Sequence, residues 1–260
     1  MMESKIVEHQ KEDGGQAHVL FLHKDKTTST MDDMREYLAN TAEPFPAGID
    51  AVVIVADMQT AGRGTGTRTW MSATRGNLYC TLALPLARVR TDLCPLLPLV
   101  LAVALHRVLA AAASSQRVHI KWPNDILAAD GRKLAGTLLE CRRGAVAAGV
   151  GVNIAAAPVL STGRAAASLA DLCDGDARVL PSPEDVARAL CRELLALATG
   201  KEDKGALLAE YRCSVDWKAP VHERAMPDVP LVALGITDDG HLLVRRPDGS
   251  TDTLIDSYLV

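Results

Sequence analysis

The chain has no closely spaced pair of cysteines. Its six cysteines stand far apart, at positions 80, 94, 141, 173, 191 and 213, and no C-x-x-C motif is present. Structural zinc sites and redox-active disulfides usually require such a pair. We therefore expect reduced thiols, which are typical of a cytoplasmic protein.

An excess of positive charge is also missing. The 28 lysines and arginines are outnumbered by 32 aspartates and glutamates, which gives a formal net charge of −4. A surface that binds nucleic acid is normally basic, because it must neutralise phosphates. The sequence therefore predicts no nucleic-acid partner.

No targeting segment is visible. The first seventeen residues contain four acidic side chains, whereas mitochondrial leaders are poor in acidic residues. Residues 95–113 are strongly apolar, but they include His106 and Arg107 and lack flanking membrane anchors. We expect this segment to be a buried helix, and we expect no membrane partner.

Several common catalytic motifs are absent as well. The chain contains neither the G-x-G-x-x-G fingerprint of dinucleotide-binding folds nor a Walker A loop. Its seven histidines show no metal-ligand spacing, and no Ser-His-Asp set stands out. The sequence thus offers no obvious covalent nucleophile and no protein-held metal.

What the chain does contain is an irregular alternation of strand and helix patterns. We expect a flexible polar tail at residues 1–17, followed by an α+β domain with a mixed β-sheet at residues 18–212. Residues 213–260 carry short strands between turn signals and predict a separate small β-barrel. Strands are expected at residues 18–22, 51–56, 77–86, 118–121, 126–128, 134–141 and 145–154, and helices at 31–38, 96–113, 184–198 and 204–211.

A glycine-rich segment, QTAGRGTGTRTW at residues 59–70, follows the second predicted strand. Its alternating glycines allow backbone amides to wrap around an anion, and Arg63 and Arg68 add fixed positive charge. A flexible solvated loop would have the same composition. This segment alone does not distinguish the two interpretations.

A second segment, KWPND at residues 121–125, leads into a predicted hairpin at Asp130-Gly131. Lys121 and Lys133 flank this hairpin, so both can face one side of the sheet. Asn124 offers a donor and an acceptor that suit an adenine or ribose edge. Asp125 could bind a metal, orient an amine or close the turn. Each of these side chains is also compatible with an ordinary surface or turn position.

A third segment, GVGVN at residues 149–153, places two glycines and an asparagine in a strand-like run. Such glycines indicate either close approach of a ligand to the backbone or a β-bulge. Together, the three segments supply charge and orientation without a nucleophile. That combination suits the attack of one bound substrate on another, and activation of a carboxylate by a nucleotide is one such reaction.

From about residue 29 onward, the chain resembles the biotin–protein ligases. The shared motifs are GRG-x-x-x-R-x-W at residues 62–70, KWPND at 121–125, KLAG at 133–136 and GxGxN at 149–153. The resemblance implies a catalytic domain of the biotin/lipoate ligase type and an SH3-like C-terminal β-barrel. It also implies that ATP and Mg²⁺ are used to attach biotin to a lysine of biotin carboxyl carrier domains of carboxylases, through biotinyl-5′-AMP.

The resemblance further implies roles for individual residues. Lys133, Arg63, Arg68 and Asp125 would carry the catalysis, with Asp125 orienting the incoming lysine amine or accepting its proton. Mg²⁺ would be held mainly through the ATP phosphates rather than by protein ligands. The biotin pocket would consist of Ser29, Thr30, Met31, Gln59, Gly62, Arg63, Gly64, Thr65, Lys133 and Gly136. The nucleotide would contact Arg68, Trp70, Lys121, Asn124, Lys133 and Asn153.

The chain departs from the family pattern at two positions. Met31 stands where the family often has Asn, so its backbone would serve biotin, and Thr65 stands where Arg is common. We expect Thr65 to make the protein release biotinyl-5′-AMP more readily. Slower release by a Thr65→Arg variant would support this expectation, and an unchanged rate would count against it.

Two alternative functions fit parts of the same pattern. A lipoate–protein ligase shares the catalytic architecture, and a non-catalytic sensor of biotinyl-adenylate would share the binding residues. About 28 residues precede Ser29, which is too few for the DNA-binding helix-turn-helix domain of some relatives. We therefore expect the form of the family without that domain.

Overall fold

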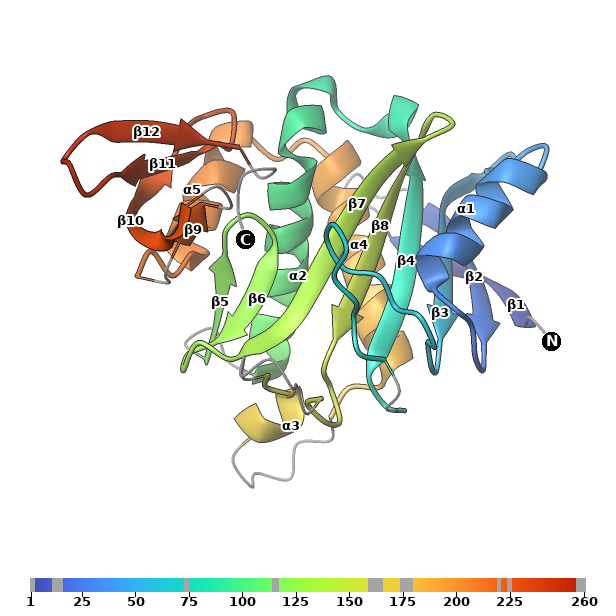
Figure 1. Cartoon of the computed structure of the whole chain (residues 1–260). Coiled ribbons are helices and arrows are strands. Elements are labelled where there is room, and N and C mark those ends of the chain that lie inside the picture. Colours follow the sequence, from blue (N-terminus) through green and yellow to red (C-terminus); the bar gives the residue numbers. More distant parts are fainter. Residues whose placement is uncertain are drawn as a thin grey trace.

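The computed structural model describes residues 3–10, 16–72, 75–113, 117–158, 166–173, 180–218, 221–223 and 226–255. The described residues form one eight-stranded sheet with helices on both faces and one four-stranded sheet near the C-terminus (Figure 1). The arrangement is α+β with a large mixed sheet, as the sequence predicted.

The large sheet has the strand order β1-β2-β3-β4-β8-β7-β6-β5. Strands β2 and β3 pair in parallel, and the other neighbouring strands of this sheet pair antiparallel. The order brings β8 between β4 and β7, so segments far apart in sequence become neighbours. Its strands are β1 Glu3–Gln10, β2 Gln16–Lys24, β3 Ile49–Ala56, β4 Leu78–Pro85, β5 Val118–Lys121, β6 Asp125–Ala128, β7 Lys133–Arg142 and β8 Ala145–Val152.

Helices cover both faces of this sheet. Helices α2 and α4 pack together on one face, and α1 packs on the opposite face against β3, β4 and β8 (Figure 1). Strands β3 and β8 are accordingly buried along their whole length, as expected for strands covered on both sides. The helices are α1 Thr30–Asn40, η1 Leu86–Arg88, η2 Thr91–Leu96, α2 Leu97–Ala113, α3 Leu169–Leu172, α4 Pro183–Thr199 and α5 Lys204–Ser214.

The apolar helix predicted near residues 96–113 lies in the core. The helical stretch Thr91–Ala113 has the length and composition that could cross a membrane, but 67% of its apolar window is buried inside the protein. Helix α2 contacts α4, α5 and the strands β5 and β6. The prediction of a buried helix is confirmed.

The prediction of a flexible N-terminal tail is wrong for residues 3–10. These residues form β1, which pairs antiparallel with β2 from Glu3 opposite His23 to Gln10 opposite Gln16. The physical reason lies in the backbone, because β2 would otherwise leave its unpaired amides and carbonyls at the edge of the sheet. Residues 16–17 of the predicted tail begin β2, and residues 1–2 and 11–15 lie outside the described residues.

The C-terminal strands form a small antiparallel sheet in the order β12-β11-β10-β9. Its strands are β9 Val221–Glu223, β10 Met226–Ile236, β11 Leu242–Arg245 and β12 Thr251–Leu254. Over residues 221–223 and 226–255, no pairing joins β9 to β12, so closure into a barrel stays a prediction. Helix α5 runs past the predicted domain boundary at residue 212 and ends at Ser214.

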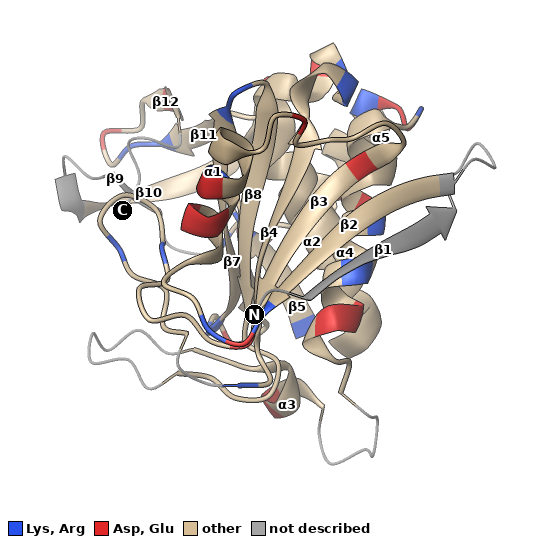
Figure 2. Cartoon of the chain, turned by 90° about the vertical axis from the view of Figure 1, so that its right-hand side faces the viewer, with Lys and Arg blue, Asp and Glu red and all other residues tan. Residues whose placement is uncertain are grey.

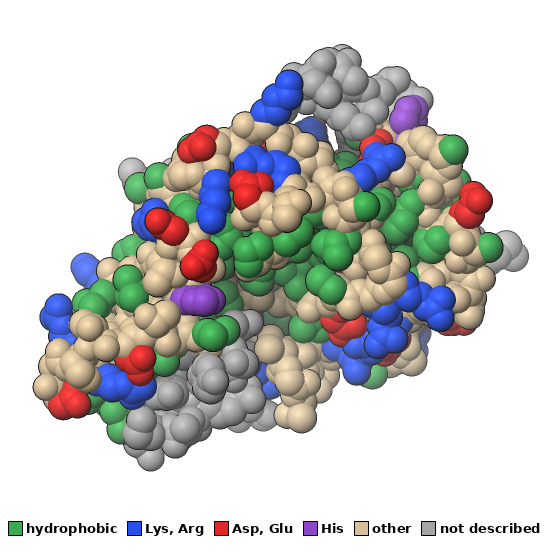
Figure 3. All heavy atoms as spheres, turned by 90° about the horizontal axis from the view of Figure 1, so that it is seen from above, with side chains coloured by type: hydrophobic (Ala, Val, Ile, Leu, Met, Phe, Trp, Pro, Cys, Tyr) green, Lys and Arg blue, Asp and Glu red, His purple; other side chains and the backbone are tan. Residues whose placement is uncertain are grey.

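Charges are mixed over the faces that the figures show. Basic and acidic residues are interspersed in the view of Figure 2, where acidic residues lie along α1. The view from above likewise shows both signs of charge around a band of hydrophobic side chains (Figure 3).

Candidate active site

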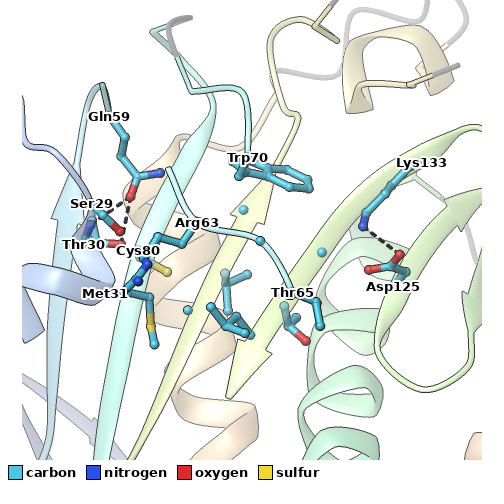
Figure 4. Close-up of a pocket in the computed structure, with 17 residues that line it drawn as sticks. Ser29, Thr30, Met31, Gln59, Arg63, Thr65, Trp70, Cys80, Asp125 and Lys133 are labelled. Atoms are coloured by element: carbon cyan, nitrogen blue, oxygen red, sulfur yellow. Dashed lines mark hydrogen bonds and ion pairs between the residues drawn. The ribbon is translucent and has the colours of Figure 1, made fainter. Parts of the chain in front are cut away.

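A cavity lies between the glycine-rich loop and the face of the large sheet that carries α1 (Figure 4). Five segments distant in sequence contribute to it: the start of α1, the loop at residues 59–70, β4, β6–β7 and β8. Of the residues predicted to bind ligands, those in the lining are Ser29, Thr30, Met31, Gln59, Arg63, Gly64, Thr65, Trp70, Asp125, Lys133 and Gly136.

One end of the cavity is a network of neutral hydrogen bonds. The Gln59 Oε1 atom accepts hydrogen bonds from the Thr30 backbone N–H at 2.8 Å and from Thr30 Oγ1 at 3.3 Å. The Gln59 Nε2 atom donates to Ser72 Oγ at 2.8 Å, and Thr81 Oγ1 donates to Thr30 Oγ1 at 2.9 Å. Gln59 and Thr30 are thus fixed in place without any ligand contact.

Ser29 differs from its neighbours in this network. It occupies the N-cap position of α1, but its side chain makes no capping hydrogen bond. Its Oγ atom is buried and has no hydrogen-bond partner among the described residues. Because buried polar atoms are normally paired, Ser29 Oγ is available to a ligand that enters the cavity.

The floor of the cavity is formed by glycines. A Cβ atom on Gly151 would lie 2.4 Å from the Trp70 ring, and one on Gly149 would lie 2.7 Å from Met31 Sδ. A Cβ on Gly136 would lie 3.0 Å from both Lys133 and Trp70. The glycines therefore let Trp70 and Met31 lie directly on the sheet. Strand β8 keeps a regular register through residues 149–151, so the alternative of a β-bulge there is wrong.

The other end of the cavity carries an ion pair. Lys133 Nζ lies 2.7 Å from Asp125 Oδ2 and 5.5 Å from the centroid of the Trp70 ring (Figure 4). Lys133 begins β7 and Asp125 begins β6. Their pairing gives Lys133 a counter-ion and a cation–π contact that hold its ammonium group inside the cavity.

The glycine-rich loop folds back on itself. The Gly64 N–H donates to Arg68 O at 2.8 Å, the Trp70 N–H donates to Gly62 O at 2.9 Å, and Gly66 takes a φ of 67° at the turn. A positive φ of this kind favours glycine. The fold-back directs Trp70 toward the sheet and places Arg63 beside α1, where Arg63 Nη1 lies 2.8 Å from Asp32 Oδ1.

Five residues predicted to bind ligands lie outside the cavity lining: Gly62, Arg68, Lys121, Asn124 and Asn153. Arg68 is exposed and donates within its own loop, from Nε to Thr65 O at 3.3 Å. Gly62 lies where a Cβ would be 2.5 Å from Trp70 O, so it permits the tight fold-back. For all five residues, direct contact with biotin or nucleotide stays a prediction.

The KWPND segment forms a turn that is fixed from several sides. Asn124 Nδ2 donates to Thr137 O at 3.1 Å, and Thr137 Oγ1 donates back to Asn124 O at 3.3 Å. Trp122 Nε1 donates to Gly240 O and Tyr211 Oη to Pro123 O, each at 2.9 Å. The turn therefore joins β7, α5 and the small sheet, and it presents Asp125 to the cavity.

Asn153 is almost completely buried and ties together two backbone segments. Its Nδ2 donates to Ala167 O at 3.0 Å and to Lys133 O at 3.4 Å. Its Oδ1 is buried and has no partner among the described residues. Asn153 thus positions the start of β7 and leaves one acceptor available.

Six lining residues were not among the predicted site residues: Cys80, Thr137, Leu138, Gly149, Val150 and Gly151. The two glycines belong to a motif that the sequence did single out for close approach to the backbone. The others reach the cavity through the pairing of β8 with β4 and β7. Burial raises the pKa of the Cys80 thiol well above its ordinary value, so this thiol is not a nucleophile in the cavity.

Comparison with known proteins places this arrangement in a family. Residues 24–155 match the model of the biotin/lipoate A/B protein ligase family. The chain is 32% identical over 223 residues to the biotin–[acetyl-CoA-carboxylase] ligase of Mycobacterium tuberculosis, covering 84% of this chain and 80% of that protein. It is also 32% identical over 218 residues to the corresponding ligase of Paracoccus denitrificans, covering 75% of this chain and 85% of that protein.

A solved relative extends the agreement to the whole fold. The biotin protein ligase of Leishmania major in complex with biotinyl-5-AMP superposes with a TM-score of 0.69 at 32% identity, covering 91% of this chain and 98% of that chain. The resemblance drawn from the sequence motifs is confirmed. The chain belongs to the biotin/lipoate A/B protein ligase family.

Proposed function

We propose that this protein is a biotin–protein ligase, which forms biotinyl-5′-AMP from biotin and ATP and then transfers the biotinyl group to a lysine of a biotin carboxyl carrier domain. The main observation that supports this proposal is that one cavity has a neutral hydrogen-bonding end and a cationic end. Biotin has the matching polarity, because a neutral ureido ring and a carboxylate stand at its opposite ends.

The neutral end favours biotin over lipoate. Ser29 Oγ is buried without a partner among the described residues, and leaving a buried hydroxyl unpaired costs about 1–3 kcal/mol. The ureido group offers both N–H donors and a carbonyl acceptor at this position. The dithiolane ring of lipoate offers neither, so it would leave the hydroxyl unsatisfied.

The cationic end addresses the main difficulty of the first step, which is to bring two anions together. Lys133 lies at this end and Arg63 lines the cavity beside α1. Fixed positive charge offsets the repulsion between a carboxylate and a phosphate. An oxygen of the biotin carboxylate attacks the α-phosphorus of ATP, and the bond to pyrophosphate breaks. Lys133 neutralises charge on both groups.

The second step uses the same cavity. The uncharged ε-amine of the acceptor lysine attacks the acyl carbon of biotinyl-5′-AMP, the bond between this carbon and the phosphate oxygen breaks, and AMP leaves. We assign to Asp125 the role of orienting that amine or accepting its proton, because its carboxylate lies at the cavity beside Lys133. Asn124, Asn153, Lys121, Arg68 and Trp70 remain our candidates for nucleotide contacts.

Mg²⁺ fits this site through the ATP phosphates. Asp125 is the one carboxylate among the described residues that line the cavity. The described part of the chain also holds no group of three His, Cys, Asp or Glu side chains placed for a metal. Mg²⁺ commonly binds through one or two carboxylates together with phosphates, and bound in that way it would offset charge on the triphosphate.

Ligand entry requires the glycine-rich loop to move. The cavity encloses about 50 Å³, which is room for a few water molecules, and Trp70 lies against Gly151 within it. Biotin therefore displaces Trp70 as it enters. A loop built on alternating glycines with exposed charge is suited to such opening.

We also propose a catalytic rather than a sensing role and a cytoplasmic location. A sensor would not need Lys133 and Arg63 at the cavity, because these cations serve the joining of two anions. All six cysteines are free, which suits a reducing compartment.

Mass spectrometry of a carrier domain tests this proposal. The domain is incubated with the protein, biotin, ATP and Mg²⁺, and we expect its mass to rise by one biotinyl group. Lipoate in place of biotin should give no such product. Failure of the protein to release pyrophosphate from ATP when biotin is present would overturn the proposal.

A further inference from the structure

Asp32 is a charged residue beside the cavity that has no part in the proposed chemistry. It lies in the first turn of α1, next to Met31 of the cavity lining. Its Oδ1 atom accepts hydrogen bonds from Arg63 Nη1 at 2.8 Å and from Arg35 Nη1 at 2.9 Å. One carboxylate oxygen thus joins the glycine-rich loop to α1.

The Arg35 side chain, which contacts Asp32, is itself held by the large sheet. Arg35 Nε donates to Glu140 Oε2 of β7 at 2.8 Å, and Arg35 Nη2 pairs with the other oxygen of Glu140. This two-point contact fixes the guanidinium of Arg35. Arg35 in turn steadies Asp32, so the acceptor that Arg63 meets is anchored to both α1 and β7.

The loop begins beside α1, where Gln59 Oε1 accepts from the Thr30 N–H and the Ala61 N–H donates to Thr28 O. Beyond residue 61, the other described hydrogen bonds of the loop are local. The Gly64 N–H bonds to Arg68 O, and the Trp70 N–H bonds to Gly62 O. These bonds set the shape of the loop but do not fasten it to α1. The pair between Arg63 and Asp32 fastens residues 62–70 to α1, and it does so on the rim of the cavity that Arg63 lines.

We propose that Asp32 is a positioning residue that holds Arg63, and with it the glycine-rich loop, over the bound biotinyl group. The identity of the ligand rests on the proposed function, whereas the holding of the loop does not. Both side chains are about 40% exposed, at 40% for Arg63 and 43% for Asp32. Exposed pairs contribute modestly, so we expect effects of about two- to five-fold.

Hydrogen exchange of the protein without substrates tests the holding role. The Asp32→Asn variant should exchange the amides of residues 62–70 about two- to five-fold faster than the unchanged protein. The Arg63→Gln variant should show the same acceleration. The double variant should show no more than either single one, because each change breaks the same pair. Unchanged exchange in Asp32→Asn, or additive effects in the double variant, would overturn the proposal.

Two controls distinguish an effect on the glycine-rich loop from an effect on helix α1. Asp32 also lies at the N-terminal end of α1, where an acidic residue favours the helix. The amides of residues 34–40 should therefore exchange at the unchanged rate, and an acceleration there equal to that of the loop would show a purely structural role. Glu36→Gln removes an exposed acid from the same helix and should leave both segments unchanged.

Kinetics supply the second readout. Asp32→Asn should raise the KM for biotin and the release rate of biotinyl-5′-AMP by about two- to five-fold, with kcat nearly unchanged, because Asp32 does not meet the reacting atoms. A fall in kcat at constant KM would contradict the positioning role. If the unchanged protein does not consume ATP in the presence of biotin, the proposed function fails, and the exchange experiment still decides the role of Asp32.

Discussion

Lys133 illustrates what a single residue contributes at this site. Its ammonium group meets a carboxylate, an indole ring and the glycine floor at one point. The resemblance of the KLAG motif predicted its importance, whereas the lysine alone was also compatible with an ordinary surface position. The sequence could not show that Asp125 is its partner, since their proximity depends on the pairing of β6 with β7.

Replacing Lys133 by Ala should abolish activation of biotin while leaving the fold intact. Loss of one preorganised charge of this kind typically lowers the rate by about 10²–10³-fold. Lys133 and Asp125 are each about one-third exposed, so loss of their pair should change stability by less than about 1 kcal/mol. Biotin-dependent exchange of pyrophosphate into ATP measures the rate, and thermal unfolding measures the stability.

Lys201→Ala is a matched control, because Lys201 is exposed and lies outside the cavity lining. This variant should change neither the rate of pyrophosphate exchange nor the thermal stability. Pyrophosphate exchange that survives in Lys133→Ala would show that the central role assignment is wrong.

A Gly151→Ala substitution should impair the site by steric means alone. The added methyl group would meet the Trp70 ring at 2.4 Å, so Trp70 must leave the floor. Displacement of a site residue by about 1 Å can lower activity up to about 10²-fold. We expect at least a tenfold loss of biotin activation, together with a change in tryptophan fluorescence. Unfolding should stay cooperative, because Trp70 belongs to a loop, and an unchanged fluorescence spectrum would contradict the contact.

At the scale of elements, the sequence predicted most helices and strands but not their neighbours. Helix α1 extends two residues beyond the predicted end at Leu38, and the buried runs of β3 and β8 were recognised by their β-branched and small residues. Strand β1 was missed because its short apolar pair, Ile6 and Val7, stands among charged residues. The placement of β8 between β4 and β7 is a long-range pairing that no local pattern encodes.

The same limit explains the mixed outcome for the site. Most of the site residues predicted from the GRG and KLAG motifs line the cavity, and the structure brings them together there. Thr137 lines the cavity without belonging to any recognised motif. Asn124 and Asn153 belong to such motifs, but the structure gives them backbone carbonyls as partners. A motif indicates that a residue matters for the site. Which atoms its side chain contacts depends on how the strands pair in the assembled sheet.

The free energy of unfolding should depend on pH because of His106, which lies in helix α2. Burial lowers the pKa of His106 below its ordinary value of 6.5, while a hydrogen bond with Val118 O partly opposes this effect. The unfolded chain therefore binds a proton near pH 6.5 that the folded protein resists. His106 should thus make the free energy of unfolding fall as the pH drops below about 6.5, with no further change below the folded-state pKa.

Urea unfolding between pH 7.5 and pH 5 checks this expectation. Part of the loss of stability on acidification should disappear in a His106→Gln variant, because glutamine does not titrate. Carboxylates titrate equally in both proteins, so the difference between the two pH profiles isolates His106. Parallel profiles would contradict the assignment.

At the scale of the whole molecule, the two sheets meet at the KWPND turn. Trp122 Nε1 donates to Gly240 O in the turn between β10 and β11. A Cβ on Gly240 would lie 2.8 Å from Leu96 and 3.1 Å from Leu99, so this turn packs closely on the start of α2. Arg212 of α5 adds contacts to Ile236 O and Asp238. The small sheet is therefore fastened beside the segment that leads to Asp125.

A Trp122→Phe substitution should destabilise the protein by about 1–3 kcal/mol, because it leaves the Gly240 carbonyl buried without its donor. Denaturant unfolding measures the change. Trp217→Phe is a matched control, since Trp217 Nε1 also donates to a backbone carbonyl, Arg212 O, at 2.9 Å, but from a half-buried position where water can substitute. Its effect should be smaller, and equal losses would show that burial is not the deciding factor.

The glycine floor beneath Trp70 has a consequence for inhibitor design. The indole ring of Trp70 rests on Gly151 and lines the cavity that we propose for biotin. A flat aromatic compound that slides onto Gly151 would compete with the protein's own indole for that surface. Such a compound would keep Trp70 away from Gly151, and it would need no chemical resemblance to biotin.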